Sequence, residues 1–457
     1  MHDIAIIGGG PGGYVCAIRA AQNGLSVALV EKGQLGGVCL NRGCIPTKAL
    51  AHTADVMDGA SRAAELGLVI PEVRLDFARV MARKDKVVAR LRGGVGLLLK
   101  RRKVDVSSGV GTLAGTRAVE VTAPDGSVTR IEARNIVIAT GSEPVAPRMF
   151  GYDGVNMLTS DDVLKLKELP QSMLIVGAGV IGCEFASIFR TFGCEVTMVD
   201  IMPNILPMVD EDVANTVRAA FAKRGIKIHT GTKITSVKVA DGQVEATCED
   251  GKTLIAQKGV LSVGRRPTTG GVGAADVGID TGDAGEIIVD SQMRTNVPGI
   301  WAIGDVTGKS QLAHVASAQG LAVAANVAGQ SRSVEYYAVP NCIFTNPEVA
   351  AVGVSERNAQ ESGIDYRVGK FPFVASGKAV AMGAPEGFVK VIADGAGRVI
   401  GGQVVGAHAS DLIAEIALAV SRRLKLEDIS ETIHAHPTLA ESTAEAVEAT
   451  VGQAIHI

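Results

Sequence analysis

Two stretches of the chain alternate short apolar runs with segments of helical periodicity. In residues 3–30, the apolar run Ile4–Ile7 is followed by glycines, a helical pattern and a second apolar run. Such runs joined by helical segments are typical of buried parallel strands connected by helices. The second stretch extends from residue 170 to Pro267 and predicts strand 173–177, helix 179–193, strand 196–200, helix 210–225, strand 226–230 and a last apolar run at Val260–Val263.

The rest of the chain shows two further patterns. Between the two stretches, the sequence predicts helices at 44–66 and 76–103 and β-rich runs at Val119–Val121, Val128–Ile131 and Ile136–Ala139. Thr140–Pro144 breaks the last strand and marks a boundary. After Tyr336, strand-like runs at 349–354, 387–393 and 399–406 alternate with helical segments at 411–424 and 439–451. We therefore expect an α/β chain with two Rossmann-like domains and a C-terminal α+β domain.

Composition narrows the class of protein. The 457 residues are enough for about three or four domains, and the net charge of −3 argues against a nucleic-acid or anionic-membrane partner. No apolar run approaches the roughly 20 residues of a membrane span, and no secretory signal precedes the first strand. Seven cysteines in so long a chain do not resemble a secreted disulfide scaffold, so we expect a cytoplasmic protein. Five of them are interpreted as buried apolar residues: Cys16, Cys183, Cys194, Cys248 and Cys342.

A glycine-rich turn follows the first strand of each stretch. The first fingerprint is Gly8–Gly13, with Glu31 ending the next strand, and the second is Gly177–Gly182, with Asp200 in the same place. In both, the acid lies 18 residues past the last glycine (13 to 31 and 182 to 200). These glycines bring a pyrophosphate to a helix N-terminus, and the acid accepts hydrogen bonds from a ribose. The glycines could serve turns alone, but the strand, helix and acid together favour two dinucleotide sites.

A cysteine pair lies between the two fingerprints. Inside one regular helix, the spacing of Cys39 and Cys44 would hold their sulfur atoms apart. We therefore expect the pair at a loop-to-helix junction, with Gly43 taking an unusual backbone angle. Pro46 is compatible with the first turn of a helix that starts near Cys44. A helix N-terminus there would stabilise the Cys44 thiolate. The alternatives are two unrelated buried cysteines or a structural disulfide, and a cytoplasmic location favours redox use.

A histidine near the C-terminus is the candidate proton acceptor. His436 precedes Pro437, which favours an extended backbone at His436 and a helix that begins at Pro437 or Thr438. Glu441 would then lie in the first turn, where its carboxylate can orient the imidazole. There are two alternatives: His436 could bind a metal together with His434, or it could merely cap a helix. We interpret His434 as structural.

These motifs together resemble the flavoprotein pyridine nucleotide-disulfide oxidoreductases (class I), and most closely the dihydrolipoamide dehydrogenase branch. The resemblance covers nearly the whole chain and rests on the two fingerprints and four further motifs: Leu35–Lys48, Thr140–Ser142, Ala302–Asp305 and His434–Glu441. It implies an FAD-binding domain with a redox disulfide at 1–145, an NAD-binding domain at 146–266, a central segment at 267–337 that completes the FAD domain, and an interface (dimerisation) domain at 338–457.

The resemblance also implies which residues hold the two cofactors. The FAD-binding residues would be Gly8, Gly10, Gly12, Gly13, Glu31, Lys32, Gly37, Val38, Cys39, Lys48, Gly111, Thr140, Gly141, Ser142, Asp305, Gln311, Leu312, Ala313 and His314. The NAD-binding residues would be Gly177, Gly179, Val180, Ile181, Gly182, Glu184, Asp200, Ile234 and Gly264. Asp200 would repel a 2′-phosphate, and Ile201–Pro203 offers no arginine to bind one, so the sequence favours NAD over NADP.

By the same resemblance, Cys39 exchanges with substrate, Cys44 faces the flavin, and Lys48 pairs with Glu184. His436, oriented by Glu441, would act on the dithiol of the other subunit of a homodimer. The implied activity is oxidation of dihydrolipoamide carried by the acyltransferase of a 2-oxo acid dehydrogenase complex or by a glycine-cleavage lipoyl protein. The alternatives are an NAD(P)H-dependent reductase of another small disulfide, such as a glutathione- or mycothiol-like one, and a non-enzymatic redox sensor. No metal is expected.

Overall fold

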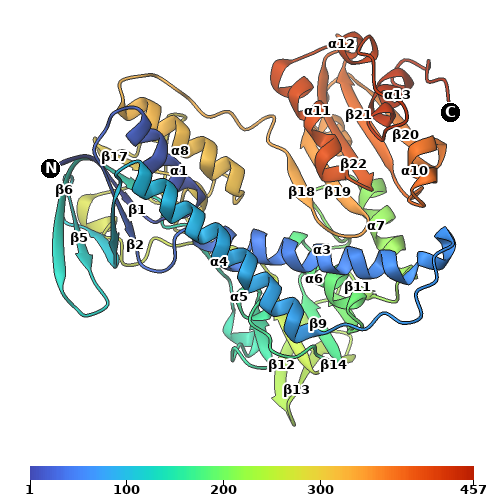
Figure 1. The fold of residues 1–457 in the computed structure, drawn as a ribbon, viewed down its shortest axis with the longest axis horizontal. Helices are drawn as coiled ribbons and strands as arrows, with labels where there is room; N and C mark the ends of the chain where they lie inside the picture. Colours follow the sequence, from blue (N-terminus) through green and yellow to red (C-terminus); the bar gives the residue numbers. More distant parts are fainter.

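Three sheets of five or more strands organise the chain in the computed structural model, which describes residues 1–457. Figure 1 shows them as three bodies: the N-terminal sheet with α1 and α8 on the left, the second sheet below the centre, and the C-terminal sheet at the upper right. The expected α/β class, with two parallel-sheet units followed by a different C-terminal domain, is confirmed.

The first sheet contains the first fingerprint. Its strands in spatial order are β3 (Asp105–Ser108), β2 (Val27–Glu31), β1 (His2–Ile7), β6 (Val128–Ile138), β5 (Ala118–Thr122) and β4 (Val110–Leu113). The late strand β17 (Ile300–Ala302) pairs with β6, so a distant part of the chain completes this sheet. β6 pairs antiparallel with β5 at its start and parallel with β1 at its end, because one 11-residue strand includes both apolar runs seen in the sequence.

Helices connect this sheet to the rest of the molecule. α1 (Pro11–Gln22) and α8 (Ala313–Val327) pack against each other, and a Cβ on Gly320 would come within 2.5 Å of the Gly12 carbonyl oxygen. α2 (Gly37–Arg42) and α3 (Cys44–Ser61) carry the cysteine pair, and α4 (Phe77–Arg101) packs along α3. The short 3₁₀ helices of the chain are Ala63–Leu66, Arg148–Phe150, Ala275–Val277, Gly304–Thr307 and Phe373–Ala375.

The second sheet contains the second fingerprint and is parallel throughout. Its strands in order are β11 (Lys227–His229), β10 (Glu195–Val199), β9 (Ser172–Val176), β15 (Lys258–Leu261) and β8 (Met157–Thr159). Its helices are α5 (Ser160–Val163), α6 (Val180–Thr191) and α7 (Glu211–Lys223). Two small antiparallel sheets flank it: β12 (Ile234–Ala240), β13 (Gln243–Cys248) and β14 (Thr253–Ala256) form one, and β7 (Ser142–Pro144) with β16 (Arg265–Pro267) forms the other.

The C-terminal domain, which begins at β18, is an antiparallel sheet covered by helices. The strand order is β18 (Asn341–Ile343), β19 (Glu348–Gly353), β22 (Val399–Gly406), β21 (Phe388–Asp394) and β20 (Tyr366–Pro372). Its helices are α9 (Glu356–Glu361), α10 (Gly377–Ala381), α11 (Ala409–Arg422), α12 (Leu426–Ser430) and α13 (Glu441–Ala449). The mixed α+β interpretation of this region is confirmed, although the sequence pattern did not reveal β18 or β20.

Three details differ from the sequence-based expectations. The helix expected to begin at Pro437 or Thr438 begins at Glu441, because the Thr438 hydroxyl donates to the Ala435 carbonyl oxygen and the Thr438 N–H donates to the Glu441 carboxylate. Cys39 lies in the short helix α2 rather than in a loop. Cys342 is half-buried, whereas the other four cysteines interpreted as apolar are buried.

Candidate functional site

The first fingerprint forms a tight turn closed by an acid. Gly8 has φ +111°, and a Cβ there would overlap the Ala139 carbonyl oxygen, so only glycine fits. One carboxylate oxygen of Glu31 accepts the Gly9 N–H at 2.6 Å, and the other accepts the Gly33 N–H at 2.7 Å. Helix α1 then starts with neither a side-chain cap nor an acidic residue in its first turn, which leaves its N–H groups and dipole for an anion.

Two glycines from different segments keep the space beside this helix end open. Gly37, at the start of α2, has φ +59°, and a Cβ on it would lie 2.6 Å from the Cα of Gly10. Backbone therefore approaches backbone where the redox segment crosses the fingerprint. An uncapped helix N-terminus, a glycine cradle and a ribose-binding acid fit the phosphates and ribose of a dinucleotide such as FAD.

The second fingerprint repeats this arrangement. Gly177 has φ +103°, and a Cβ there would overlap the Ser262 carbonyl oxygen. Asp200 accepts the Ala178 N–H at 2.5 Å and the Met202 N–H at 2.8 Å. Around Gly179 no atom lies within 4 Å of a Cβ position, and helix α6 begins there without a side-chain cap. The geometry fits a second dinucleotide such as NAD.

The two cysteines lie at the junction of α2 and α3. Gly43, with φ −146° and ψ −111°, separates the two helices, and Cys44 is the first residue of α3. The side chains of Cys39 and Cys44 are in hydrogen-bond contact as thiols. Asn41 holds the turn that precedes them, since its amide group donates to the carbonyl oxygens of Leu35 and Gly37 at 3.0 and 2.9 Å. Asn41 lies inside the cysteine motif but was not among the predicted site residues.

The surroundings of Cys44 favour its thiolate. The Cys39 thiol donates a hydrogen bond to Cys44, and this bond together with the Lys48 ammonium outweighs burial and lowers the pKa of Cys44 to about 7. The same hydrogen bond raises the pKa of Cys39. Cys44 is exposed, whereas Cys39 is half-buried. The pair therefore has one sulfur that ionises near neutral pH and one that stays protonated.

A lysine–glutamate pair lies one helical turn past Cys44. Lys48 Nζ lies 2.8 and 2.9 Å from the two carboxylate oxygens of Glu184, which is buried in α6. Glu184 also accepts the Phe344 N–H at 3.0 Å, and Lys48 Nζ lies 4.3 Å from the centre of the Phe344 ring. Residues from all three sheet regions therefore meet at Lys48.

Two further arginines, Arg265 and Arg42, make polar contacts near the redox segment. Arg265 donates to the side chain and carbonyl oxygen of Ser142, at 2.8 Å each, and the Ser142 hydroxyl donates to Asp305 at 2.5 Å. Arg42, between the two cysteines, lies 3.1 Å from Asp161. Burial raises the pKa of Asp161. Asp161 was not among the predicted site residues, because no sequence pattern connects it to the cysteine motif.

The histidine–glutamate pair forms as the sequence predicts. His436 Nδ1 lies 2.8 Å from one oxygen of Glu441, and the other oxygen accepts the Thr438 N–H at 2.7 Å. These bonds outweigh burial and lower the pKa of Glu441. His436 is 81% exposed, whereas His434 is held by Glu415 and the Thr432 carbonyl oxygen at 2.8 Å each. Figure 1 shows α13, which begins at Glu441, within the C-terminal body at the upper right, apart from α3, which runs across the centre.

The remaining predicted cofactor residues occupy varied positions. Leu312 caps α8, which begins with Ala313 and His314, and burial lowers the pKa of His314. Gly111 lies beneath β1 and β2, where a Cβ would come within 3.0 Å of Ile7. Ile234 is 4% exposed, and its side chain packs in an apolar cluster of the second sheet region. Residues in exposed or half-buried positions include Lys32, Val38, Thr140, Gly141, Val180, Ile181, Gly264 and Gln311.

Two dinucleotide-type folds with a dithiol between them define a dinucleotide-dependent dithiol–disulfide oxidoreductase. Comparison with known families agrees. The model of the pyridine nucleotide-disulphide oxidoreductases matches residues 2–320, and that of the dimerisation domain of these proteins matches residues 339–447. The chain belongs to the pyridine nucleotide-disulphide oxidoreductase family.

Similar proteins extend over the whole chain. The dihydrolipoyl dehydrogenase of Chlamydia muridarum is 45% identical over 458 residues, covering 100% of this chain and 98% of the relative. That of Bacillus subtilis is 41% identical and covers 100% and 97%. Among solved structures, LpdA from Mycobacterium tuberculosis is 31% identical with a TM-score of 0.93, covering 97% of this chain and 98% of that one. The HOCl-induced flavoprotein disulfide reductase RclA from Escherichia coli is 29% identical with a TM-score of 0.87, covering 98% and 99%.

The family establishes the general chemistry. The chain is an NAD-dependent flavin disulfide oxidoreductase that uses FAD and NAD, and it carries the dimerisation domain of its family. None of its helices has both the length and the apolar character that crossing a membrane requires.

Proposed function

We propose that this protein oxidises dihydrolipoyl groups to lipoyl groups and transfers the electrons to NAD⁺. The observation that carries the proposal is the contact between Cys39 and Cys44 at the start of α3, with Lys48 one turn away. The relatives that share the whole length of the chain and are named dihydrolipoyl dehydrogenase support this substrate. The expected FAD- and NAD-binding residues are part of the same proposal.

The dithiol step follows from the chemistry of the side chains. His436, oriented by Glu441, accepts a proton from one thiol of the substrate. The resulting thiolate attacks Sγ of Cys39, which breaks the Cys39–Cys44 bond and leaves Cys44 as a thiolate. The second substrate thiol attacks the substrate sulfur of this mixed disulfide, and its proton passes to the departing Cys39 sulfur. The lipoyl disulfide closes, Cys39 is released as a thiol, and the cysteine pair has gained two electrons.

The low pKa of Cys44 suits it to be the leaving sulfur in this exchange. Lys48, held by Glu184, keeps a positive charge beside that thiolate. When bound, FAD supplies the two-electron carrier between the cysteine pair and NAD⁺. The uncapped start of α1 and the carboxylate of Glu31 would hold its pyrophosphate and ribose, and Asp305 would hold a region nearer the flavin.

We further propose that the working unit is a homodimer in which His436 of one protomer serves the cysteines of its partner. The exposure of His436 and the dimerisation domain at 339–447 support this arrangement. The domain borders at 145, 266 and 337 belong to the same proposal. So do a lipoyl-bearing acyltransferase or glycine-cleavage lipoyl protein as partner and a cytoplasmic, reducing location.

The test is NADH formation from dihydrolipoamide by the purified yellow holoenzyme, with NAD⁺ and with NADP⁺. We expect rapid turnover with NAD⁺. Cys44→Ser should retain FAD and lose this turnover by orders of magnitude, and full activity of that variant would refute the cysteine pathway. A flavin that NADH reduces but dihydrolipoamide does not would instead indicate a reductase of another small disulfide.

A further inference from the structure

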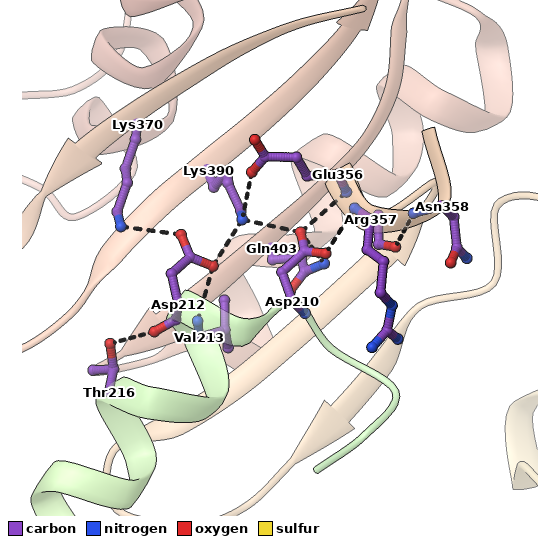
Figure 2. A network of polar contacts seen from close by, with 11 residues as sticks. Asp210, Asp212, Val213, Thr216, Glu356, Arg357, Asn358, Lys370, Lys390 and Gln403 are labelled. Carbon is purple, nitrogen blue, oxygen red and sulfur yellow. Dashed lines mark hydrogen bonds and ion pairs between the residues drawn. The ribbon is translucent and has the colours of Figure 1, made fainter. Parts of the chain in front are cut away.

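A buried lysine joins the second sheet region to the C-terminal domain. Lys390, on β21, is 1% exposed, and its Nζ lies 3.0 Å from Asp210, 2.8 Å from Asp212 and 3.2 Å from Glu356. Figure 2 shows the lysine between the start of α7, which carries the two aspartates, and the C-terminal domain, which carries Glu356. Burial opposes the charge, but Asp212 and Asp210 outweigh it and raise the pKa of Lys390.

Asp210 takes all its side-chain partners from the C-terminal domain. Besides Lys390, it accepts the side-chain amide of Gln403 at 2.9 Å and the backbone N–H groups of Glu356 and Arg357 at 3.1 and 3.2 Å. Its own backbone N–H donates to the Gln403 side-chain oxygen at 3.0 Å. A carboxylate 4% exposed with this many partners is stable only while the facing domain is in place.

Asp210 ends the segment that begins at the acid of the second fingerprint. Asp200 is at one end of residues 200–210, and within the segment the Leu206 N–H donates to the carbonyl oxygen of Ala178, inside that fingerprint, at 2.9 Å. Arg357 of the C-terminal domain donates to the Pro207 carbonyl oxygen at 2.8 Å. The segment thus contacts the nucleotide turn on one side and the C-terminal domain on the other.

We propose that Lys390 and Asp210 are positioning residues for nicotinamide nucleotide binding, through which the C-terminal domain holds segment 200–210 against the second fingerprint. The inference rests on the proposed binding of NAD at that fingerprint. Asp200 and Ala178 lie on or against this segment, so a shift at Asp210 displaces the groups that would face the ribose and pyrophosphate. The first fingerprint has no contact of this kind with the network.

Lys390→Met is the direct test, and Lys370→Met is its matched control. Lys370 also pairs with Asp212, at 3.0 Å, but is 43% exposed and does not reach Asp210. We expect Lys390→Met to weaken NADH binding by on the order of tenfold, whereas Lys370→Met stays within about twofold of the parent enzyme. The measurements are NADH titration of the flavin holoenzyme and, separately, the rate at which dihydrolipoamide reduces the flavin without nucleotide.

The two measurements separate positioning from general damage. A loss of NADH affinity with an unchanged rate of flavin reduction by dithiol supports the proposal, and recovery in Lys390→Arg would strengthen it. Unchanged NADH affinity in folded Lys390→Met, or equal losses in both measurements, would overturn it. If Lys390→Met does not fold, Arg357→Ala, which removes the Pro207 contact from an exposed side chain, is measured in its place against the same criteria. Because NADH titration needs no dithiol, failure of the dihydrolipoyl proposal leaves this test intact.

Discussion

The two fingerprints share their turn and their acid but differ in what surrounds them. In both, the first glycine faces a carbonyl oxygen that excludes a Cβ, and an acid accepts a fingerprint N–H: Glu31 from Gly9 and Asp200 from Ala178. At the equivalents Gly12 and Ile181, however, the surroundings diverge. A Cβ on Gly12 would meet Ile303 at 3.2 Å and the Ala316 carbonyl oxygen at 3.3 Å, whereas Ile181 carries a full side chain.

The same contrast holds at the third residue of each fingerprint, Gly10 in the first and Gly179 in the second. Gly37 closes over Gly10 at the first fingerprint, but no atom lies within 4 Å of a Cβ position at Gly179 in the second. Backbone from the redox segment and α8 therefore encloses the first site, while the second is open. An enclosed site suits a nucleotide that stays bound, and an open one suits a nucleotide that exchanges at each turnover. This difference supports the proposed assignment of FAD to the first and NAD to the second.

The largest effects should come from adding a Cβ inside either glycine turn. A Cβ on Gly13 would overlap the Gly8 carbonyl oxygen, and one on Gly182 would overlap that of Gly177. We expect Gly13→Ala to yield little folded, FAD-containing protein, because this turn belongs to the enclosed core. Gly182→Ala should keep its FAD and lose NADH binding. Flavin absorbance per protomer and NADH titration measure both, and equal loss of FAD in the two variants would contradict the proposed assignment.

His436→Gln should separate the dithiol side of the enzyme from the nucleotide side. Removing the proton acceptor is expected to slow dihydrolipoamide oxidation by about 10²–10⁴-fold, while NADH-to-dye electron transfer remains. His434→Gln is the neighbouring control, and a smaller effect is expected because His434 is held by Glu415. Loss of both activities in His436→Gln would indicate a folding role.

Removing Glu31 or Asp200 should weaken the binding of only the nucleotide beside that acid. A carboxylate that loses charge-assisted hydrogen bonds changes affinity by roughly 10- to 100-fold. Asp200→Ala should therefore raise the KM for NAD⁺ and reduce discrimination against NADP⁺, whereas Glu31→Ala should release FAD on dilution. Steady-state kinetics with both nucleotides and gel filtration followed by flavin absorbance distinguish them. A changed nucleotide preference in Glu31→Ala would show that the two sites are not independent.

The smallest effect concerns the thiolate of Cys44. Its pKa of about 7 depends in part on the Lys48 ammonium, so Lys48→Met should raise it. The thiolate then forms at higher pH, and at pH 7 its population in the reduced enzyme falls severalfold. Thiolate absorbance against pH is the measurement, with Lys84→Met as control, because Lys84 is a buried lysine that donates to the Leu164 carbonyl oxygen and is not among the groups that shift the pKa of Cys44. An unchanged midpoint in Lys48→Met would assign the low pKa to the Cys39 hydrogen bond alone.

Local pattern was sufficient for most of the helices and strands and for the motifs of the candidate site. Both fingerprints, the cysteine motif and the His436–Glu441 pair were recognisable because each depends on residues close together in the sequence. The helix after His436 was expected three or four residues too early, since the turn formed by Thr438 competes with the helix there. The expected proximity of Ile234 to NAD stays a prediction, and its burial depends on strand pairing that local pattern does not describe.

The sequence alone determined which chemical groups the protein has: two nucleotide-binding turns, one dithiol and one histidine–carboxylate pair. Only the tertiary structure decided which of these groups share an environment. Lys48 meets Glu184, Arg42 meets Asp161, and Lys390 meets Asp210 across distances in the chain that no periodicity spans. The physical reason is that such pairs form only when separate sheets pack together and bury their charges, so they depend on how whole domains are oriented and not on the spacing of residues along the chain.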